Sequence, residues 1–112
     1  MSSELRSMFE LGLIREVLDQ IKDERVRQIK QEGWTLEHDD QHDRGELSLA
    51  AACYALATTD CTDKSLVHHT LWPFEGKWWK PKDQRRNLVM AAAMIVAEIE
   101  RIDRLKRRME LR

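Results

Sequence analysis

Residues 2–32 contain no proline and only one internal glycine, which predicts that the chain begins with a long helix. Ser2 or Ser3 is suited to cap its first turn, and Gly33 follows as a residue that can end a helix in the left-handed conformation. At about 100° per residue, the apolar positions of its first half share one face. These positions are Ile14, Val17, Leu18 and Ile21.

This face becomes polar halfway along the predicted helix. The residues that continue it are Glu24, Arg25, Gln28 and Glu32. Charged faces are usually solvated, so one interpretation has the second half of the helix project into water. The other interpretation has Arg25, Gln28 and Glu32 line a pocket.

A second helix is predicted to begin at Asp39 or Asp40, since either carboxylate can cap a first turn, and to run to about residue 57. When its buried face is extended toward the N-terminus, the face reaches His42 and Glu46. A short connection favours antiparallel packing, which would bring both residues to the polar half of the first helix. The predicted buried positions are Leu49, Ala50, Cys53, Leu56 and Ala57.

Residues 58–82 are predicted to form a long connection that is rich in tryptophan. Trp72, Trp78 and Trp79 lie within it, and this density of large apolar rings is not typical of disordered segments. In one interpretation the rings hold the loop on the helices as ordinary core. In the other they form a stacking wall for a planar ligand, with Lys77 and Lys80 supplying positive charge.

A third helix is predicted from the cap Asp83 toward Met109. One side of it carries Leu88, Ala91, Ala92, Ile95, Ile99, Ile102 and Met109. Residues 88–97 are apolar on every side, so they need cover all round, which two other helices in a chain of 112 residues can hardly supply. The expected fold is all-α, with three main helices and the tryptophan-rich loop between the second and third. Self-association through the third helix would make it a helical-bundle homo-oligomer.

The composition predicts a single helical domain over residues 1–112. Nineteen basic and twenty acidic residues give a net charge of −1, which argues against nucleic acid as a partner. The N-terminus lacks the pattern of a signal peptide, and there are only two cysteines, so a cytoplasmic location is expected. The longest apolar run is half the roughly 20 residues that a membrane span requires, so no membrane partner is expected.

The polar face, the tryptophans and the start of the third helix together suit a phosphorylated nucleotide-type ligand. Guanidinium groups match phosphate, rings match a base, and amides or carboxylates match polar edges. A helix N-terminus also favours an anion. The candidate ligand-binding residues are Arg25, Gln28, Glu32, Trp34, His38, Asp39, His42, Glu46, Trp78, Trp79, Arg85 and Arg86.

A divalent metal (Mg, Mn or Zn) is a further expectation, with Glu32, His42 and Glu46 as ligands. His38 and His42 have the i, i+4 spacing of zinc proteases, but Asp39 stands where those enzymes have a glutamate. All-α nucleotide pyrophosphohydrolases of the MazG-like class hold Mg²⁺ with carboxylates from adjacent helices. This chain has acids on all three predicted helices but lacks the E-E-x-x-E signature of that class. Catalytic residues are not assigned.

Several short motifs spread over residues 24–104 resemble those of a known protein family. They include Glu32-Gly33-Trp34-Thr35, His38-Asp39-Asp40, Gly45-Glu46-Leu47, Trp72-Pro73-Phe74, Trp79-Lys80-Pro81 and Ala97-Glu98-Ile99-Glu100-Arg101. This pattern resembles an uncharacterised family of small helical proteins encoded by bacteriophages and prophages. The resemblance implies an accessory protein in the cytoplasm of a bacterial host cell, and it implies no particular reaction.

The leading hypothesis is a small oligomeric helical protein that binds a phosphorylated nucleotide-type ligand and sequesters a host signal or metabolite. The first alternative is a metal-dependent nucleotide pyrophosphohydrolase. The second is a protein-interaction module that uses exposed tryptophans.

Overall fold

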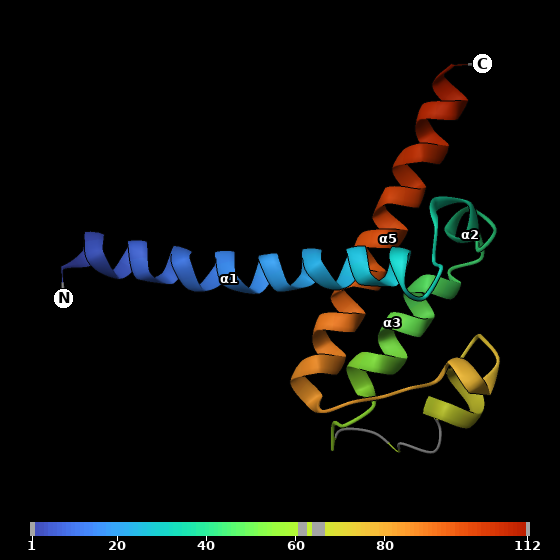
Figure 1. Cartoon of the computed structure of the whole chain (residues 1–112), viewed down its shortest axis with the longest axis horizontal. Helices are drawn as coiled ribbons and strands as arrows, with labels where there is room; N and C mark the ends of the chain where they lie inside the picture. The colour runs from blue at the N-terminus through green and yellow to red at the C-terminus, as the bar shows by residue number, and fades with distance from the viewer. Residues whose placement is uncertain (1, 61–62, 64–66, 112) are drawn as a thin grey trace.

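The computed structural model describes residues 2–60, 63 and 67–111, and within them it contains helices and no strand. The helices are α1 (Ser3–Lys30), α2 (Leu36–Asp40), α3 (Glu46–Leu56) and α5 (Gln84–Glu110), as Figure 1 shows. A π-helical turn (Val67–Leu71) and a 3-10 turn (Gly76–Trp78) interrupt the connection before α5. The prediction of an all-α chain with three substantial helices is confirmed. Within the described ranges, no helix combines the length and the apolar composition needed to cross a membrane.

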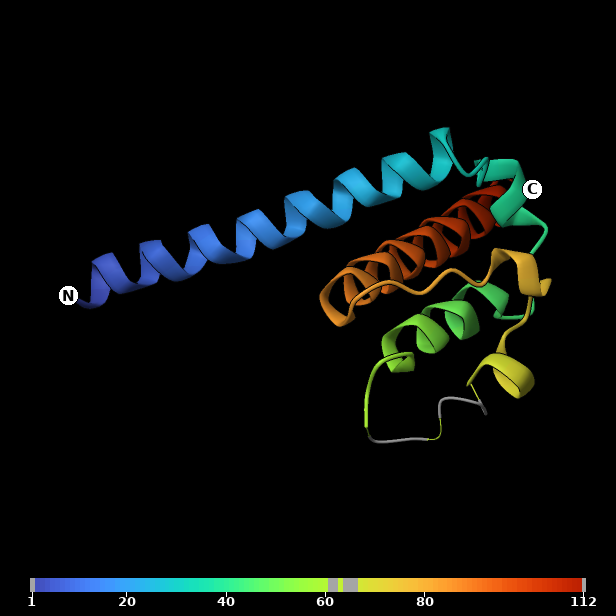
Figure 2. The same cartoon turned by 60° about the horizontal axis from the view of Figure 1, so that its bottom comes forward.

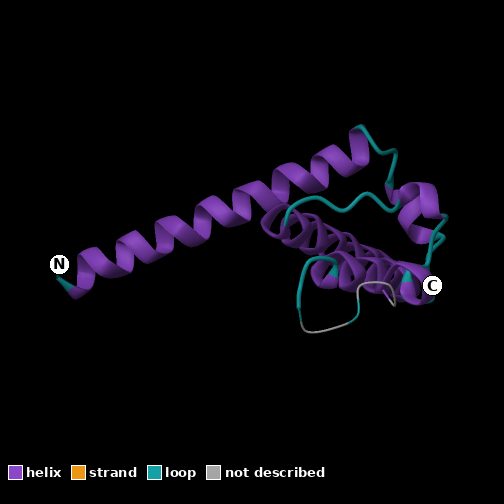
Figure 3. Ribbon diagram, turned by 90° about the horizontal axis from the view of Figure 1, so that it is seen from below, coloured by secondary structure: helices purple, strands orange, loops and turns teal. Residues whose placement is uncertain are grey.

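The start of α1 agrees with the sequence, because Ser2 is the N-cap and its Oγ accepts a hydrogen bond from the Leu5 amide at 3.1 Å. The helix ends at Lys30, before the predicted Glu32, and Gly33 reverses the chain with φ of 75°. The first half of α1 extends away from the other elements (Figure 3). Only its last two turns pack on α5.

The predicted second helix is wrong as a single element. Thr35 caps the short α2, its Oγ1 accepting from the His38 amide at 3.2 Å, and Gly45 begins α3 with φ of 86°. Asp39 and Asp40 therefore lie in the last turn of α2 and cap nothing. Arginines from distant parts of the chain bind both carboxylates instead.

The core lies between α3 and α5, where small side chains allow the two helices to approach closely. Trp34, Trp72, Phe74 and Trp79 pack around this cluster. The prediction for α3 was partly wrong, since Leu49 is exposed, whereas Leu47 and Tyr54 are buried together with Ala50, Ala51 and Cys53. The buried residues at the centre of the core are Ala50, Ala51, Tyr54, Met90, Ala91 and Met94.

Asp83 caps α5 as predicted, with its Oδ1 accepting from the Arg86 amide at 2.9 Å. Within the chain, α1 and α3 cover other sides of α5 than the one that carries most of the predicted apolar residues. Most of the predicted apolar side is about half exposed, namely Leu88, Ile95, Ile99, Ile102 and Met109. The buried positions are Asn87, Val89, Met90, Ala91, Ala93, Met94, Ala97, Glu98 and Arg101. Self-association through this helix stays a prediction.

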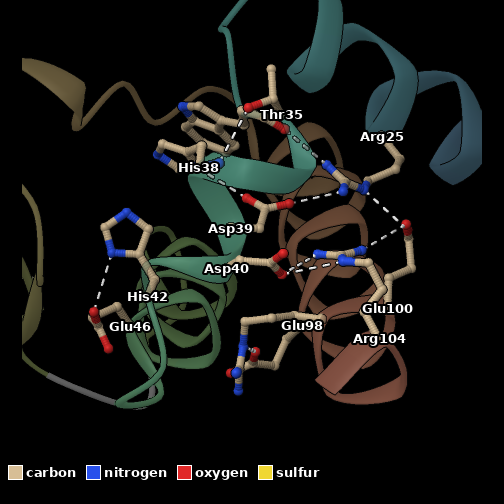
Figure 4. A network of polar contacts seen from close by, with 12 residues as sticks. Arg25, Thr35, His38, Asp39, Asp40, His42, Glu46, Glu98, Glu100 and Arg104 are labelled. Atoms are coloured by element: carbon tan, nitrogen blue, oxygen red, sulfur yellow. Dashed lines mark hydrogen bonds and ion pairs between the residues drawn. The ribbon is translucent and has the colours of Figure 1, made fainter. Parts of the chain in front are cut away.

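Ion pairs hold α2 against the two long helices (Figure 4). The Arg25 guanidinium on α1 donates to Asp39 on α2 at 2.9 Å and to Glu100 on α5 at 3.1 Å. Arg104 on α5 binds Asp40 at 2.8 Å. The Asp39 side chain is fully buried and that of Arg25 nearly so, so each compensates the desolvated charge of the other.

Asp39→Ala should therefore lower the free energy of unfolding by roughly 3–5 kcal/mol, because it leaves the Arg25 guanidinium buried without its main partner. Chemical denaturation followed by circular dichroism measures the loss. Glu37→Ala on the exposed side of the same short helix is the matched control, with an expected change within about 0.5 kcal/mol. Equal effects of the two substitutions would show that the Arg25–Asp39 pair does not hold α2.

Candidate functional site

Two adjoining cavities form one recess between the end of α1, α2, α3, the loop before α5, and α5 itself. Their volumes are about 300 Å³ and about 380 Å³. Glu32, Trp34, Trp78 and Met94 line both cavities, so we call the combined space the Trp34–Trp78 recess. Five segments of the chain thus contribute to a single site.

Aromatic rings form one wall of the first cavity. The rings of Trp34 and His38 lie nearly parallel, with an interplanar angle of 6° and centroids 6.1 Å apart. His42 contacts His38 edge to face at 4.7 Å, and Phe74 contacts His42 in the same manner at 5.0 Å. With Leu47 and Met94 opposite, this cavity suits a flat, largely apolar group.

The second cavity is charged, with four basic and two acidic side chains among the residues that line it. Glu24 lies at the centre, where Arg27 donates to both of its oxygens at 2.8 and 2.9 Å and Arg86 donates as well. Burial alone would raise the pKa of Glu24, but the hydrogen bonds and charge of Arg27 and Arg86 outweigh it, so the pKa is lowered. Arg27 also binds Glu32 at 2.9 Å.

Two lysines of this cavity are positioned by buried side chains that bind their backbone. The Tyr54 hydroxyl accepts from the Lys80 amide at 3.0 Å and donates to the Trp78 carbonyl at 3.3 Å. Asn87 accepts from the Lys82 amide at 2.6 Å and donates to the carbonyl of the same residue at 3.0 Å. Within the described ranges neither lysine ammonium has an ion-pair partner, so both are available to an anion.

Gln28 presents a buried acceptor without a partner at this cavity. Its side chain is 1% exposed, and its Nε2 donates to Glu24 at 3.0 Å and to the Met90 carbonyl at 3.4 Å. These two acceptors fix the orientation of the amide, and its Oε1 has no hydrogen-bond partner among the described residues. An unsatisfied buried acceptor costs about 1–3 kcal/mol, which a ligand that donates a hydrogen bond would recover.

The structure brings only some of the predicted site residues to the recess. Those that line it are Gln28, Glu32, Trp34, His38, His42, Trp78 and Arg86. Arg25 and Asp39 pair with each other on the far side of α2, where their charges are already compensated. Trp79 packs on Tyr54 and Trp72 in the core, and Arg85 is exposed beyond the recess.

The predicted metal ligands Glu32, His42 and Glu46 do not form a set. His42 Nδ1 lies 3.1 Å from Glu46 Oε2 (Figure 4), while Glu32 is bound by Arg27. Over residues 2–60, 63 and 67–111 no three histidine, cysteine, aspartate or glutamate side chains are grouped to hold a metal ion. The expected metal site is therefore corrected to a His42–Glu46 pair beside the first cavity.

Sequence reasoning missed Arg27, Lys82 and Phe74. Arg27 lies off the face that Gln28 occupies, and its side chain bends back to reach Glu24 and Glu32. The i, i+3 spacing of Glu24 and Arg27 is a signal that could have identified this pair. The position of Lys82 depends on Asn87, and a contact between backbone and side chain of this kind has no signature in the spacing.

No protein-family model matches this chain, and no curated protein and no solved structure gives a significant match. The chemistry of the recess is therefore the basis for assigning a function.

The lowered pKa of Glu24 predicts a specific pH dependence of stability. Its ionised form stabilises the folded state above the pKa of the unfolded chain, and this contribution is lost as the pH falls through the lowered folded pKa. Glu24→Gln should cost about 2 kcal/mol of unfolding free energy near pH 7. The difference from the parent protein should shrink as the pH falls from about 5 toward 3.

Urea denaturation at a series of pH values measures the free energy of unfolding of both proteins and tests this pH dependence. Asp40 and Glu46 also have lowered pKa values, and both remain in the variant, so the difference between the two curves isolates Glu24. A difference that stays constant over this range would contradict the assigned ionisation.

Proposed function

We propose that this chain binds a phosphorylated nucleotide-type ligand in the Trp34–Trp78 recess. The observation that carries the proposal is the juxtaposition of a ring-lined cavity with a cationic one, because a nucleotide joins a planar apolar part to an anionic part. The two cavities together have a volume in the range of about 300–1,000 Å³ that is typical of small-molecule sites.

The first cavity supports the base. A base stacked near Trp34 and His38 would bury its faces against rings, which contributes about 1–3 kcal/mol per base in comparable stacking contacts. Trp78 lines both cavities and is 37% exposed, so part of its surface is open to a ligand. The partly buried Glu32 carboxylate at the junction can accept hydrogen bonds from base or sugar donors.

The second cavity supports the phosphates and the sugar. Lys80 and Lys82 supply positive charge, and Arg86 retains donors beyond its bond to Glu24. A sugar hydroxyl beside Gln28 would donate to the unpartnered Oε1. Inorganic phosphate alone would bind the cations but would leave the ring-lined first cavity empty, so the arrangement favours a ligand that has both parts.

Binding without turnover is the form of the proposal that the carboxylates support. Arginines bind Glu24 and Glu32, and His42 lies within hydrogen-bond distance of Glu46, so each carboxylate already has a partner. In the phage setting that the family resemblance implies, such binding would sequester a host signal or metabolite. Release of phosphate or diphosphate on incubation with Mg²⁺ or Mn²⁺ would instead favour a pyrophosphohydrolase.

Ribonucleoside triphosphates should raise the melting temperature of the protein. At a ligand concentration ten times Kd, the stabilisation is about 1.4 kcal/mol, which raises the melting temperature by several degrees in a domain of this size. Thermal-shift measurements with the four common nucleotides, the free nucleosides and inorganic triphosphate separate the two parts of the site. Recovery of the intact nucleotide after incubation would show that the protein binds it without turnover. No shift with any of these compounds would contradict the proposal.

Lys80→Ala should weaken nucleotide binding about tenfold, because it removes a cation that contacts phosphate. Lys77→Ala is the matched control. Both ammonium groups lie over the Trp78 ring, at 5.7 Å for Lys80 and 5.5 Å for Lys77, but only Lys80 lines the recess. Isothermal titration of both variants measures the two effects. Equal losses would mean that the lysines act through Trp78 and not through phosphate.

A further inference from the structure

The first half of α1 forms an apolar arm that no other described segment covers. We call residues 3–21 the arm. Its side chains include Leu5, Met8, Ile14 and Leu18, which are exposed by 58%, 68%, 55% and 58%. Figure 2 shows the arm extending beyond α5 with no element of the chain beneath it. In proteins most of the stability of a helix comes from packing of its apolar residues, so the arm calls for a packing partner.

A second uncovered apolar surface runs along α5. It consists of Leu88, Ala92, Ile95, Ile99 and Ile102, which we call the outer stripe. The intervals alternate between four and three residues, which is the spacing of a seam that packs against another helix. Leu88, Ile95, Ile99 and Ile102 remain about half exposed. Monomeric proteins rarely leave apolar patches of this extent in contact with water.

The dimensions of the molecule show how far it departs from a compact domain. The radius of gyration is 16.5 Å, against about 13 Å for a compact chain of this length. The arm contributes to this difference, and so do the last turns of α5, which extend beyond the other elements (Figure 1). A partner that covered the arm would bring the assembly closer to ordinary compactness.

We propose that a second copy of this chain covers both surfaces, with the arm of each protomer packed on the outer stripe of the other. A twofold dimer makes this contact twice, since the same pair of surfaces meets at both positions. The lengths are compatible, because the arm residues that share a face with Ile14 and Leu18 are Leu11 and Ile21, which span about 15 Å of helix, and Leu88 to Ile102 spans about 21 Å. The apolar face of the arm can therefore pack along the outer stripe over its whole length.

The geometry of α5 leaves room for this contact. Arg86 and Glu100 point toward α1 of the same chain, where they pair with Glu24 and Arg25. At 100° per residue, the outer stripe lies about 140° around α5 from these two side chains. A partner's arm can therefore pack on the outer stripe while α1 of the same chain stays on the opposite side.

Charge also favours the pairing. Residues 3–23 contain five acidic and three basic side chains, whereas residues 101–111 contain five basic and two acidic ones. An acidic arm packed on the outer stripe of a partner lies near the basic residues that follow Ile102, of which the exposed Lys106 is on the same side of α5 as the stripe. Like-charged surfaces would oppose the contact, so this asymmetry favours a second copy over a basic partner on α5 and over an acidic partner on the arm.

Light scattering coupled to gel filtration tests the dimer and the surfaces that form it. The parent protein should have the mass of two chains. Ile14→Glu with Leu18→Glu on the arm, or Ile95→Glu with Ile99→Glu on the outer stripe, should each halve that mass without loss of helicity by circular dichroism. Leu36→Glu is the control, because this exposed residue lies in the first turn of α2, where a carboxylate is favourable, and it should leave the dimer intact.

Mixing the two variants distinguishes this dimer from one in which α5 pairs with α5. An equimolar mixture retains one intact arm and one intact outer stripe, so a species with the mass of two chains should return. A dimer that survives the arm substitutions, or a mixture that stays monomeric, would overturn the proposal, as would a parent protein with the mass of one chain. If a glutamate pair reduces helicity, the milder Ile14→Gln and Leu18→Gln pair gives the same comparison.

Discussion

The buried ion pair between Arg25 and Asp39 is the contact on which the arrangement of the recess depends. It joins α1 to α2, and the second bond of Arg25, to Glu100, adds α5 to the same cluster. A guanidinium is suited to this role because its planar fork bonds two carboxylates at once and keeps its charge at every relevant pH. With α2 held in this way, Trp34, His38 and His42 face the loop before α5, and the ring-lined cavity forms between them.

The charged residues of the recess have two different roles, because some form its wall and others remain available to bind a ligand. Glu24, Arg27 and Arg86 neutralise one another and fix the wall of the second cavity. Lys80 and Lys82 are held by their backbone, through Tyr54 and Asn87, so their ammonium groups remain available. Positioning a cation by its main chain avoids the carboxylate that would otherwise compete with a phosphate. This division of roles is the physical argument for an anionic ligand.

The long helices could be predicted from the sequence because their signals are local. Ser2 and Asp83 cap their helices through contacts three residues away, and the absence of proline inside each helix leaves no competing structure. The region between Thr35 and Gly45 could not be predicted, because several capping residues compete there. Asp39 does not cap a helix because its carboxylate binds Arg25, which lies 14 residues earlier in the chain. Asp40 does not cap a helix because its carboxylate binds Arg104, which lies 64 residues later. The same long-range pairs explain why Arg25 and Asp39, predicted to bind a ligand, lie outside the recess.

The faces of α1 and α5 were harder to predict for a reason that applies to the whole molecule. Periodicity identifies which residues share a face, but it does not show which face of a helix its neighbours cover. On α1 the polar end of the stripe, Glu24 to Gln28, is the part that becomes buried, and on α5 the most regular apolar stripe stays exposed. The burial of polar residues on α1 and the exposure of apolar residues on α5 have the same cause. Ion pairs and the alanine-rich contact with α3 fix α5 within the chain, and the apolar residues that remain outside are therefore free to pack against another chain.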